Sequence, residues 1–412
     1  MSTPLVTVKA DGSITLPPEV ARSLGLIPGA HARLDVDDNS LTIRRSPTHL
    51  ARLYLELTNG CNIDCTTCMR NVWDLPIAHL SAEHFQRIEA EVGAMEEKPL
   101  IFFGGFGEPL FHPRAVEYVS RTRQTGAEVD LITNGTLLTE RRIDELISAG
   151  LRRIWVSIDG ARPESYADVR LGASLPQVLR NLENLKHRKL RLAETRPELG
   201  IAFVAMERNI GDLPKVVELG LRLGAENFSI SNVIAHTERM NRETLYDEEL
   251  RQWNPKLAQV ELSRMDLNEP RVTEALKGLM ETGSRALGIP ELDLFPQKNR
   301  CPFIEKGSMS IRFDGAVSPC LSLLHGHDYY VGNVKRRSHA YQVGSVGDRS
   351  LLEMWNDPEY EDLRERLDDF SFSPCTTCRS CERIEQNKED CQGNQDPACG
   401  GCLWAQGLIR CP

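Results

Sequence analysis

Between residues 50 and 235, short apolar runs alternate with longer amphipathic stretches. Six apolar runs are expected to form β-strands: 53–57, 100–103, 129–133, 154–158, 201–206 and 228–234. Stretches such as 81–95, 139–150 and 212–224 carry apolar residues at helical spacing. Strands that are apolar at nearly every position are typical of a parallel sheet covered by helices. The pattern predicts an α/β fold, a partial (β/α)6 barrel whose site lies at the carboxyl ends of the strands.

Residues 1–47 show a different pattern, in which short β-rich runs flank one helix that begins at Pro17 and Pro18 and ends at Gly25. This predicts a small ββαββ unit. Its segment 9–36 resembles the swapped-hairpin domains of the AbrB/MazE family, which intertwine as dimers and often bind DNA. Because five basic residues balance five acidic ones in 1–47, and DNA binding needs a positive surface, we expect this region to form a homodimer rather than to bind DNA.

Two further regions complete the predicted organisation. Residues 236–300 are charged, mostly helical in pattern and free of chemical motifs, so we interpret them as a helical connecting segment. Residues 301–412 contain much Cys, Gly and Asp and few continuous apolar runs. We expect a loop-dominated domain there, whose folding depends on bound metal rather than on a large core.

Composition excludes some classes of protein. The 412 residues include 59 acidic and 49 basic ones, a net charge of −10, which argues against a sequence-independent nucleic-acid binder. The N-terminus does not resemble a signal peptide, and no stretch of about 18 apolar residues occurs, so we expect a cytoplasmic protein without membrane contact. The twelve cysteines are then expected to bind metal or act in catalysis rather than to form disulfides.

Three cysteines follow the first predicted strand. Cys61, Cys65 and Cys68 have the spacing CxxxCxxC. Three thiolates can bind three irons of a cubane cluster and leave the fourth iron open to a substrate. A zinc site that lacks one ligand, or buried free cysteines, would also fit this spacing alone.

The spacing at this place in a β/α barrel resembles the radical S-adenosylmethionine (SAM) superfamily. A second motif, GGFGEP at residues 104–109, follows the second strand and is similar to the Gly-Gly-Glu motif of that superfamily. The resemblance implies that Gly104, Gly105, Gly107 and Glu108 hold the amino group of the methionine moiety.

Two further strand ends resemble parts of the same pocket. The motif SIDG implies that Ser157 and Asp159 lie near the ribose, and Arg170 resembles the arginine that reaches the methionine carboxylate. A guanidinium suits this role because it can donate two parallel hydrogen bonds to a carboxylate. A surface ion pair is the alternative for Arg170. Asn134, in TNGT, is interpreted as a turn residue before Gly135.

The other nine cysteines lie between residues 301 and 411. Cys301, followed by GxxxxC at 315–320, resembles the SPASM domain, which holds one or two auxiliary 4Fe–4S clusters. The resemblance implies seven ligands: Cys301, Cys320, Cys378, Cys381, Cys399, Cys402 and Cys411. Cys375 and Cys391 exceed that pattern, and an eighth metal ligand could come from Cys375, from Cys391 or from the substrate. A pair of zinc sites is the alternative.

Residues 50–412 as a whole resemble radical SAM/SPASM maturases of tungsten-cofactor oxidoreductases. The resemblance implies that SAM is cleaved reductively, at a cluster on the first three cysteines, to a 5′-deoxyadenosyl radical that abstracts hydrogen from a substrate. An electron donor such as ferredoxin or flavodoxin and a protein or peptide substrate are the implied partners. Two alternatives stay open: a peptide-modifying SPASM enzyme, and a zinc-stabilised AbrB-like DNA-binding regulator. The motifs GGFGEP and SIDG argue against the regulator, which needs no SAM pocket.

Overall fold

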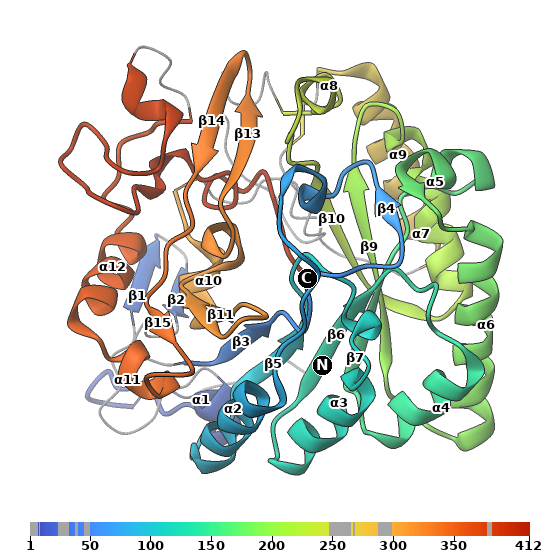
Figure 1. The fold of residues 1–412 in the computed structure, drawn as a ribbon, viewed down its shortest axis with the longest axis horizontal. Coiled ribbons are helices and arrows are strands. Elements are labelled where there is room, and N and C mark those ends of the chain that lie inside the picture. The colour runs from blue at the N-terminus through green and yellow to red at the C-terminus, as the bar shows by residue number, and fades with distance from the viewer. Residues whose placement is uncertain are drawn as a thin grey trace.

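The computed structural model describes residues 7, 9–23, 33–37, 40–44, 50–246, 265–266, 268–286, 299–376 and 381–412 (Figure 1). Its centre is a nine-stranded sheet with the order β10-β9-β7-β6-β5-β3-β11-β12-β15. Six neighbouring strands of this sheet run parallel: β3 (Arg52–Leu55), β5 (Leu100–Phe103), β6 (Val129–Thr133), β7 (Arg153–Ser157), β9 (Glu198–Ala205) and β10 (Ala225–Asn232). They lie where the apolar runs predicted them, so the predicted partial (β/α)6 barrel is confirmed.

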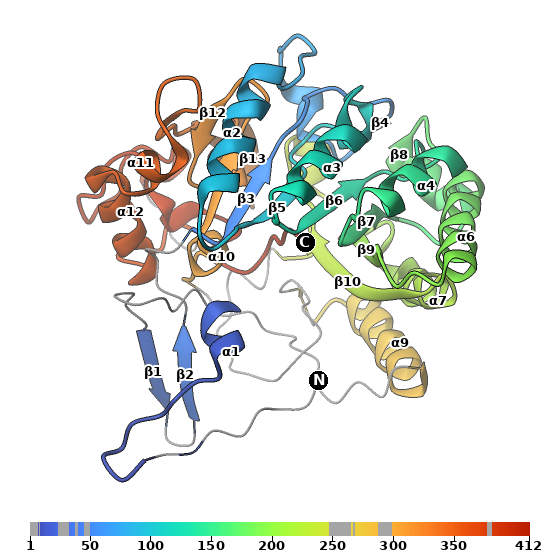
Figure 2. The same ribbon diagram turned by 90° about the horizontal axis from the view of Figure 1, so that it is seen from below.

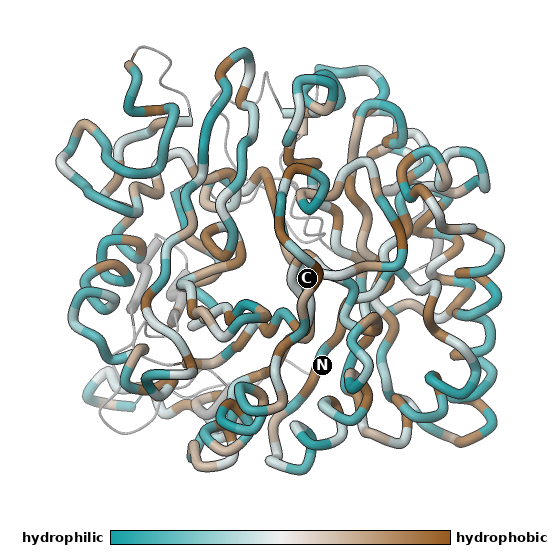
Figure 3. Tube along the Cα trace, viewed as in Figure 1, coloured by the Kyte–Doolittle hydropathy of each residue, from teal (hydrophilic) through white to brown (hydrophobic). Residues whose placement is uncertain are grey.

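Helices between these strands cover the outside of the barrel (Figure 1). They are α2 (Ala82–Ala94), α3 (Ala115–Gln124), α4 (Glu140–Ser148), α6 (Leu175–Leu192) and α7 (Leu213–Arg222). Ser81 and Thr139 begin α2 and α4, because their side chains accept hydrogen bonds from the amides of the first turn. Apolar positions gather along the central strands, and the outer helices carry most of the hydrophilic ones (Figure 3), as amphipathic helices on a buried sheet require.

The C-terminal lobe extends the barrel's own sheet. Its strand β11 (Ser308–Ile311) pairs in parallel with β3, and β12 (Ala316–Ser318) and β15 (Gly344–Ser345) continue the sheet in antiparallel fashion. The lobe adds a separate hairpin and three helices: β13 (His327–Val331), β14 (Val334–Ser338), α10 (Pro302–Glu305), α11 (Leu351–Trp355) and α12 (Pro358–Asp368).

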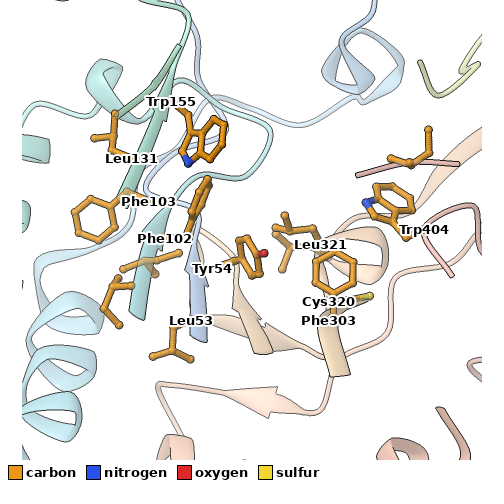
Figure 4. Packing of buried hydrophobic residues seen from close by; sticks show 14 of the residues in the cluster. Leu53, Tyr54, Phe102, Phe103, Leu131, Trp155, Phe303, Cys320, Leu321 and Trp404 are labelled. Carbon is orange, nitrogen blue, oxygen red and sulfur yellow. The ribbon is translucent and has the colours of Figure 1, made fainter. Parts of the chain in front are cut away.

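One hydrophobic core joins the lobe to the barrel. In Figure 4, Tyr54, Phe102 and Trp155 of the barrel belong to the same cluster as Phe303 and Leu321 of the lobe. The rings of Tyr54 and Phe303 are 5.7 Å apart. The lobe is loop-dominated as expected, because most of its described residues lie outside helices and strands, but the expectation that it lacks a large core is wrong. The lobe's apolar residues are spread over short helices and strands, so no long run reveals them in sequence, yet they become buried on the edge of the sheet.

The N-terminal region is described in part. It contains α1 (Pro18–Ser23) and an antiparallel hairpin of β1 (Arg33–Asp37) and β2 (Ser40–Arg44), which Figure 2 shows outside the main sheet. The predicted helix and second strand pair are thus present. The residues between α1 and β1 lie outside the described ranges, and the AbrB-like fold and dimer stay predictions.

The connecting segment is partly helical where it is described. It contains α8 (Glu238–Asn241) and α9 (Pro270–Ala286), and an added Cβ at Gly278 of α9 would lie 2.9 Å from Pro214 of α7. Residues 247–264, 267 and 287–298 of the predicted segment lie outside the described residues. No helix within the described ranges has the length and apolar character needed to cross a membrane.

Candidate functional site

The three cysteines of the first motif lie in the loop that follows β3. Cys65 belongs to the short strand β4 (Asp64–Cys65), which pairs with β8 (Arg170–Leu171), and the Cys68 amide donates to the Cys65 carbonyl at 3.0 Å. All three thiols are free and partly exposed. A single loop at the carboxyl end of the first barrel strand therefore carries three partly buried cysteines.

A buried arginine lies next to one of these thiols. Arg170 forms an ion pair with Asp159, with 2.7 Å between Nη2 and Oδ2, and its Nη1 donates to the Cys65 sulfur at 3.8 Å. Burial raises the pKa of the Cys65 thiol to about 11, and Arg170 opposes this rise. Burial also raises the pKa of Cys61. These thiols become thiolates when a cation compensates their charge, as a thiolate-binding metal does.

Asp159 and Arg170, which the sequence assigns to the ribose and to the methionine carboxylate, contact each other in the structure. Asp159 is fully buried, and its Oδ1 accepts the amide of Val204 at 2.8 Å. The predicted contacts of Asp159 and Ser157 with a ribose, and of Arg170 with a carboxylate, stay predictions. The alternative of a surface ion pair for Arg170 is wrong, because its ion pair with Asp159 is buried and adjoins Cys65.

Asn134 forms the predicted turn and also contacts the cysteine loop, which the motif does not predict. Its Nδ2 donates to the Cys61 sulfur at 3.7 Å and to Asn62 Oδ1 at 3.0 Å. Its Oδ1 accepts the amide of Thr136, and Gly135 has a φ of +78°, so the predicted turn is also formed. The available signal was its place at the end of β6, since the ends of parallel strands meet at one edge of a sheet.

The glycine motif packs directly against the cysteine loop. A Cβ added at Gly107 would lie 1.9 Å from the Thr58 carbonyl oxygen, and one at Gly105 would lie 2.7 Å from the Glu56 side chain. The Glu108 amide donates to the Gly60 carbonyl at 2.8 Å. Only glycine at position 107 allows this approach, so the two motifs form one interlocked surface.

The Glu108 carboxylate ties the ends of two strands together. It accepts hydrogen bonds from the Thr133 hydroxyl at 2.7 Å, the Asn134 amide at 2.8 Å and the Leu110 amide at 3.1 Å. Burial raises the pKa of Glu108, while these donors favour its ionised form. Three protein donors thus already bind the Glu108 carboxylate, to which the motif assigns a ligand's amino group. Because a carboxylate has about four acceptor sites, about one site remains for that amino group.

A buried contact links this surface to the C-terminal lobe, and the sequence did not predict it. Glu56 Oε2 is hydrogen-bonded to His325 Nε2 at 2.8 Å, and Glu56 Oε1 accepts the Phe106 amide at 3.0 Å. The His325 ring stacks on Trp73, with 4.0 Å between ring centroids. The lobe therefore supports both the glycine turn and the segment that follows Cys68.

Four cysteines of the C-terminal lobe surround one cavity of about 50 Å³, which Cys375 also lines: Cys301, Cys320, Cys399 and Cys402. Figure 4 shows Cys320 beside Phe303 inside the shared core. Burial raises the pKa of Cys301 to about 12 and that of Cys320 well above its ordinary value, and the neighbouring thiolates add to both shifts. Four thiols around one space, three of them on buried residues and Cys402 partly exposed, fit a group that binds thiolates and supplies positive charge.

Cys381, Cys391 and Cys411 do not line this cavity. Cys411 accepts a hydrogen bond from the Trp404 indole at 3.3 Å, and burial raises its pKa. Cys381 and Cys391 are exposed, and the Cys391 sulfur lies 3.0 Å from the Ser373 hydroxyl. Cys378 lies outside the described residues. The structure therefore groups Cys399 and Cys402 with the first two cysteines of the lobe, a grouping that the spacing left open.

Comparison with known proteins defines the class in two steps. Residues 55–195 match the family described as the radical SAM superfamily. Residues 301–382 match SPASM, described as an iron–sulfur cluster-binding domain. The chain therefore belongs to the radical SAM/SPASM enzymes. The regulator alternative gains no support from these matches.

Similar curated proteins extend over most of the chain. A tungsten-containing aldehyde ferredoxin oxidoreductase cofactor-modifying protein of Pyrococcus furiosus is 28% identical over 364 residues, 87% of this chain and 96% of that protein. A PqqA peptide cyclase of Granulibacter bethesdensis is 26% identical over 82% of each chain.

Solved structures share the fold. Streptococcus suis SuiB bound to the precursor peptide SuiA has a TM-score of 0.52 and 14% identity, covering 77% of this chain and 67% of that one. Native anSMEcpe with bound AdoMet has a TM-score of 0.52 and 18% identity, covering 80% of this chain and 86% of that one. At these identities the likeness concerns the fold alone.

A buried histidine predicts a pH effect on stability. Burial, and next the neighbouring His327, lower the pKa of His236 to about 4. The unfolded chain takes up this proton as pH falls through about 6.5, while the folded protein stays neutral until about 4. Stability is therefore lost as pH falls across this window, by about 2 kcal/mol between pH 7 and pH 5.

Chemical denaturation of the anaerobic protein at these two pH values measures the effect. His236→Asn should show a pH-dependent loss that is smaller by that amount. His187→Asn, on the exposed side of α6, is the matched control and should behave as the wild type does. Equal losses in both variants would contradict the assignment.

Proposed function

We propose that Cys61, Cys65 and Cys68 hold a 4Fe–4S cluster and that the adjoining glycine turn binds SAM. The observation that carries this proposal is the interlocking of the two motifs through Gly107, beside the Thr58 carbonyl, and Glu108, beside Gly60. When bound, the cluster and SAM supply a one-electron cleavage of the sulfonium that produces a 5′-deoxyadenosyl radical.

The chain's own residues orient these groups. Arg170, fixed by Asp159, lies beside Cys65 and stabilises its thiolate. Asn134 donates to Cys61 on the other side of the loop. The Gly104–Phe106 backbone is held by Glu56, and Glu56 by His325 of the C-terminal lobe. We expect the turn's remaining polar groups to bind the methionine end of SAM.

We further propose that the C-terminal lobe holds two auxiliary clusters. Cys301, Cys320, Cys399 and Cys402 would hold the first, because they surround one cavity. The second would use Cys375, Cys381 and Cys391, with Cys378 from the same stretch of sequence. This assignment departs from the seven-ligand expectation in leaving Cys411 without a cluster, since Cys411 does not line the cavity of the other buried cysteines.

We infer that the substrate is a tungsten-cofactor oxidoreductase, or its cofactor. The support is the Pyrococcus furiosus protein, which is similar over 96% of its length. Such an oxidoreductase, produced together with either the wild-type chain or its Cys61/Cys65/Cys68→Ala variant, is the test. A cofactor that differs in mass between the two preparations supports the inference, and identical cofactors contradict it.

The peptide-modifying alternative rests on the PqqA peptide cyclase, similar over 82% of each chain. In the same experiment it predicts an unchanged cofactor. A mass change would occur instead in a short peptide encoded beside this chain. We propose ferredoxin or flavodoxin as the electron donor in either case. We also propose a cytoplasmic location, where a reducing environment keeps cysteines as the free thiols that the described residues contain.

The N-terminal region is proposed to form the dimer. Deleting residues 1–47 should convert a dimer into a monomer, because swapped hairpins bury their apolar faces only against a second copy, and SAM cleavage per chain should persist. Light scattering and a 5′-deoxyadenosine assay measure both. A monomeric full-length protein would contradict the dimer, and sequence-specific DNA binding with a steep salt dependence would favour the DNA-binding function.

A further inference from the structure

The C-terminal lobe contains a buried arginine that the proposed chemistry has not used. Arg336 lies in the middle of β14 and is 2% exposed. Its neighbours Lys335 and Arg337 are exposed and both form ion pairs with Asp328 at 2.9 Å. Because side chains alternate across a strand, Arg336 points to the opposite side, toward the interior of the lobe.

No carboxylate of the described residues lies within ion-pair distance of Arg336. Its Nη2 donates to the Cys375 carbonyl at 2.9 Å, whereas its Nε and Nη1 have no hydrogen-bond partner in the part of the chain that the structure describes. An uncompensated buried cation is costly, as are buried donors without acceptors. This arrangement needs a compensating negative group nearby.

The guanidinium lies between two of the cysteine segments. A Cβ added at Gly401 would be 3.2 Å from Arg336 Nη1, so the charge adjoins the turn that carries Cys399 and Cys402. Tyr329, opposite Arg336 in the β13–β14 hairpin, donates to the Gly401 carbonyl at 3.3 Å and fixes the same turn. Arg336 therefore borders the turn of Cys399 and Cys402 on one side and Cys375 on the other.

We propose that Arg336 tunes the reduction potential of the auxiliary cluster held beside the Cys399–Cys402 turn; the inference rests on the cluster assignment made above. A cubane with four thiolate ligands is an anion, and taking up one electron adds a further negative charge. A fixed buried cation favours the reduced state, so it raises the reduction potential. Arg336 thus acts on the cluster through its charge and does not contact the substrate.

The test uses full-length protein with the Cys61/Cys65/Cys68→Ala substitutions, so that only the auxiliary clusters carry iron. Potentiometric titration followed by electron paramagnetic resonance measures their midpoints. Arg336→Gln should lower the midpoint potential of one auxiliary cluster by at least 59 mV. For a one-electron couple this is a tenfold change in the equilibrium constant for reduction. Arg337→Gln removes the same charge from the exposed side of the strand and should leave the midpoint within a twofold change of that equilibrium.

A second variant covers the case in which Arg336→Gln fails to fold or to bind iron. Arg336→Lys keeps the charge, so it should retain iron. Its equilibrium constant for reduction should lie within threefold of that of the parent. A tenfold fall in Arg336→Lys, or equal midpoints in Arg336→Gln and the parent, would overturn the role of the charge. A parent protein with no iron in its C-terminal lobe would instead overturn the cluster assignment and this inference with it.

Discussion

Replacing Cys61, Cys65 and Cys68 together by Ala should abolish the cleavage of SAM to 5′-deoxyadenosine while leaving most of the protein's iron in place. The three thiols lie in one loop, and no cysteine of the C-terminal lobe belongs to that loop. If two cubane clusters occupy the lobe, the variant should retain about eight iron atoms per chain, four for each. Iron and sulfide analysis of anaerobic protein, with chromatography of the reaction products, measures both quantities.

The matched control is Thr67→Ala, which changes a side chain between Cys65 and Cys68 but removes no thiol. It should keep full cleavage and the full iron content. About four iron atoms in the triple variant would show one auxiliary cluster instead of two. Stoichiometric zinc in anaerobic protein would show that the C-terminal cysteines form structural zinc sites, and cleavage by the triple variant would refute the role of the loop.

The second large effect is expected from one methyl group. Gly107→Ala places a Cβ 1.9 Å from the Thr58 carbonyl oxygen, so the glycine turn and the cysteine loop can no longer approach each other. We expect unfolding free energy to fall by about 3 kcal/mol, the upper part of the range for overpacking. SAM cleavage should fall at least tenfold, because the displaced turn adjoins the segment that leads to Cys61.

Gly211→Ala is the control for this substitution. Gly211 lies in the 3₁₀ helix Ile210–Asp212, and a Cβ there would meet no atom within 4 Å. Its stability and activity should match those of the wild type. Denaturant titration and the product assay compare the two variants, and equal behaviour would show that the contact between the motifs is unimportant.

The barrel and the first cysteine motif could be predicted because their signals are local. Parallel strands buried on both faces are nearly continuous apolar runs, as in 100–103, and the CxxxCxxC spacing lies within one loop. The helix starts at Ser81 and Thr139 are equally local, since a side chain caps the turn that follows it.

Contacts between distant segments could not be predicted in this way. Glu56 and His325 are 269 positions apart, and neither lies in a motif that names the other. The same holds for the core that joins Tyr54 to Phe303, which made the C-terminal lobe look poorer in buried surface than it is. The grouping of Cys301 with Cys402 depends on how the lobe folds back on itself, and spacing carries no information about that.

Asn134 shows the limit of interpreting a motif by its commonest role. An Asn-Gly pair after a strand predicts a turn, and the turn is formed. The same side chain also donates to Cys61, because β6 ends at the edge where the cysteine loop lies. Strand order, rather than the motif itself, brings the two together.

We propose that this chain cleaves SAM reductively at the loop of Cys61, Cys65 and Cys68. The most direct measurement is the amount of 5′-deoxyadenosine formed when anaerobically purified, iron-loaded wild-type protein is mixed with SAM and dithionite. We predict that the product accumulates with time and is absent without the reductant or in the Cys61/Cys65/Cys68→Ala variant. Wild-type protein that carries its full iron complement and forms no 5′-deoxyadenosine would refute reductive SAM cleavage by this chain.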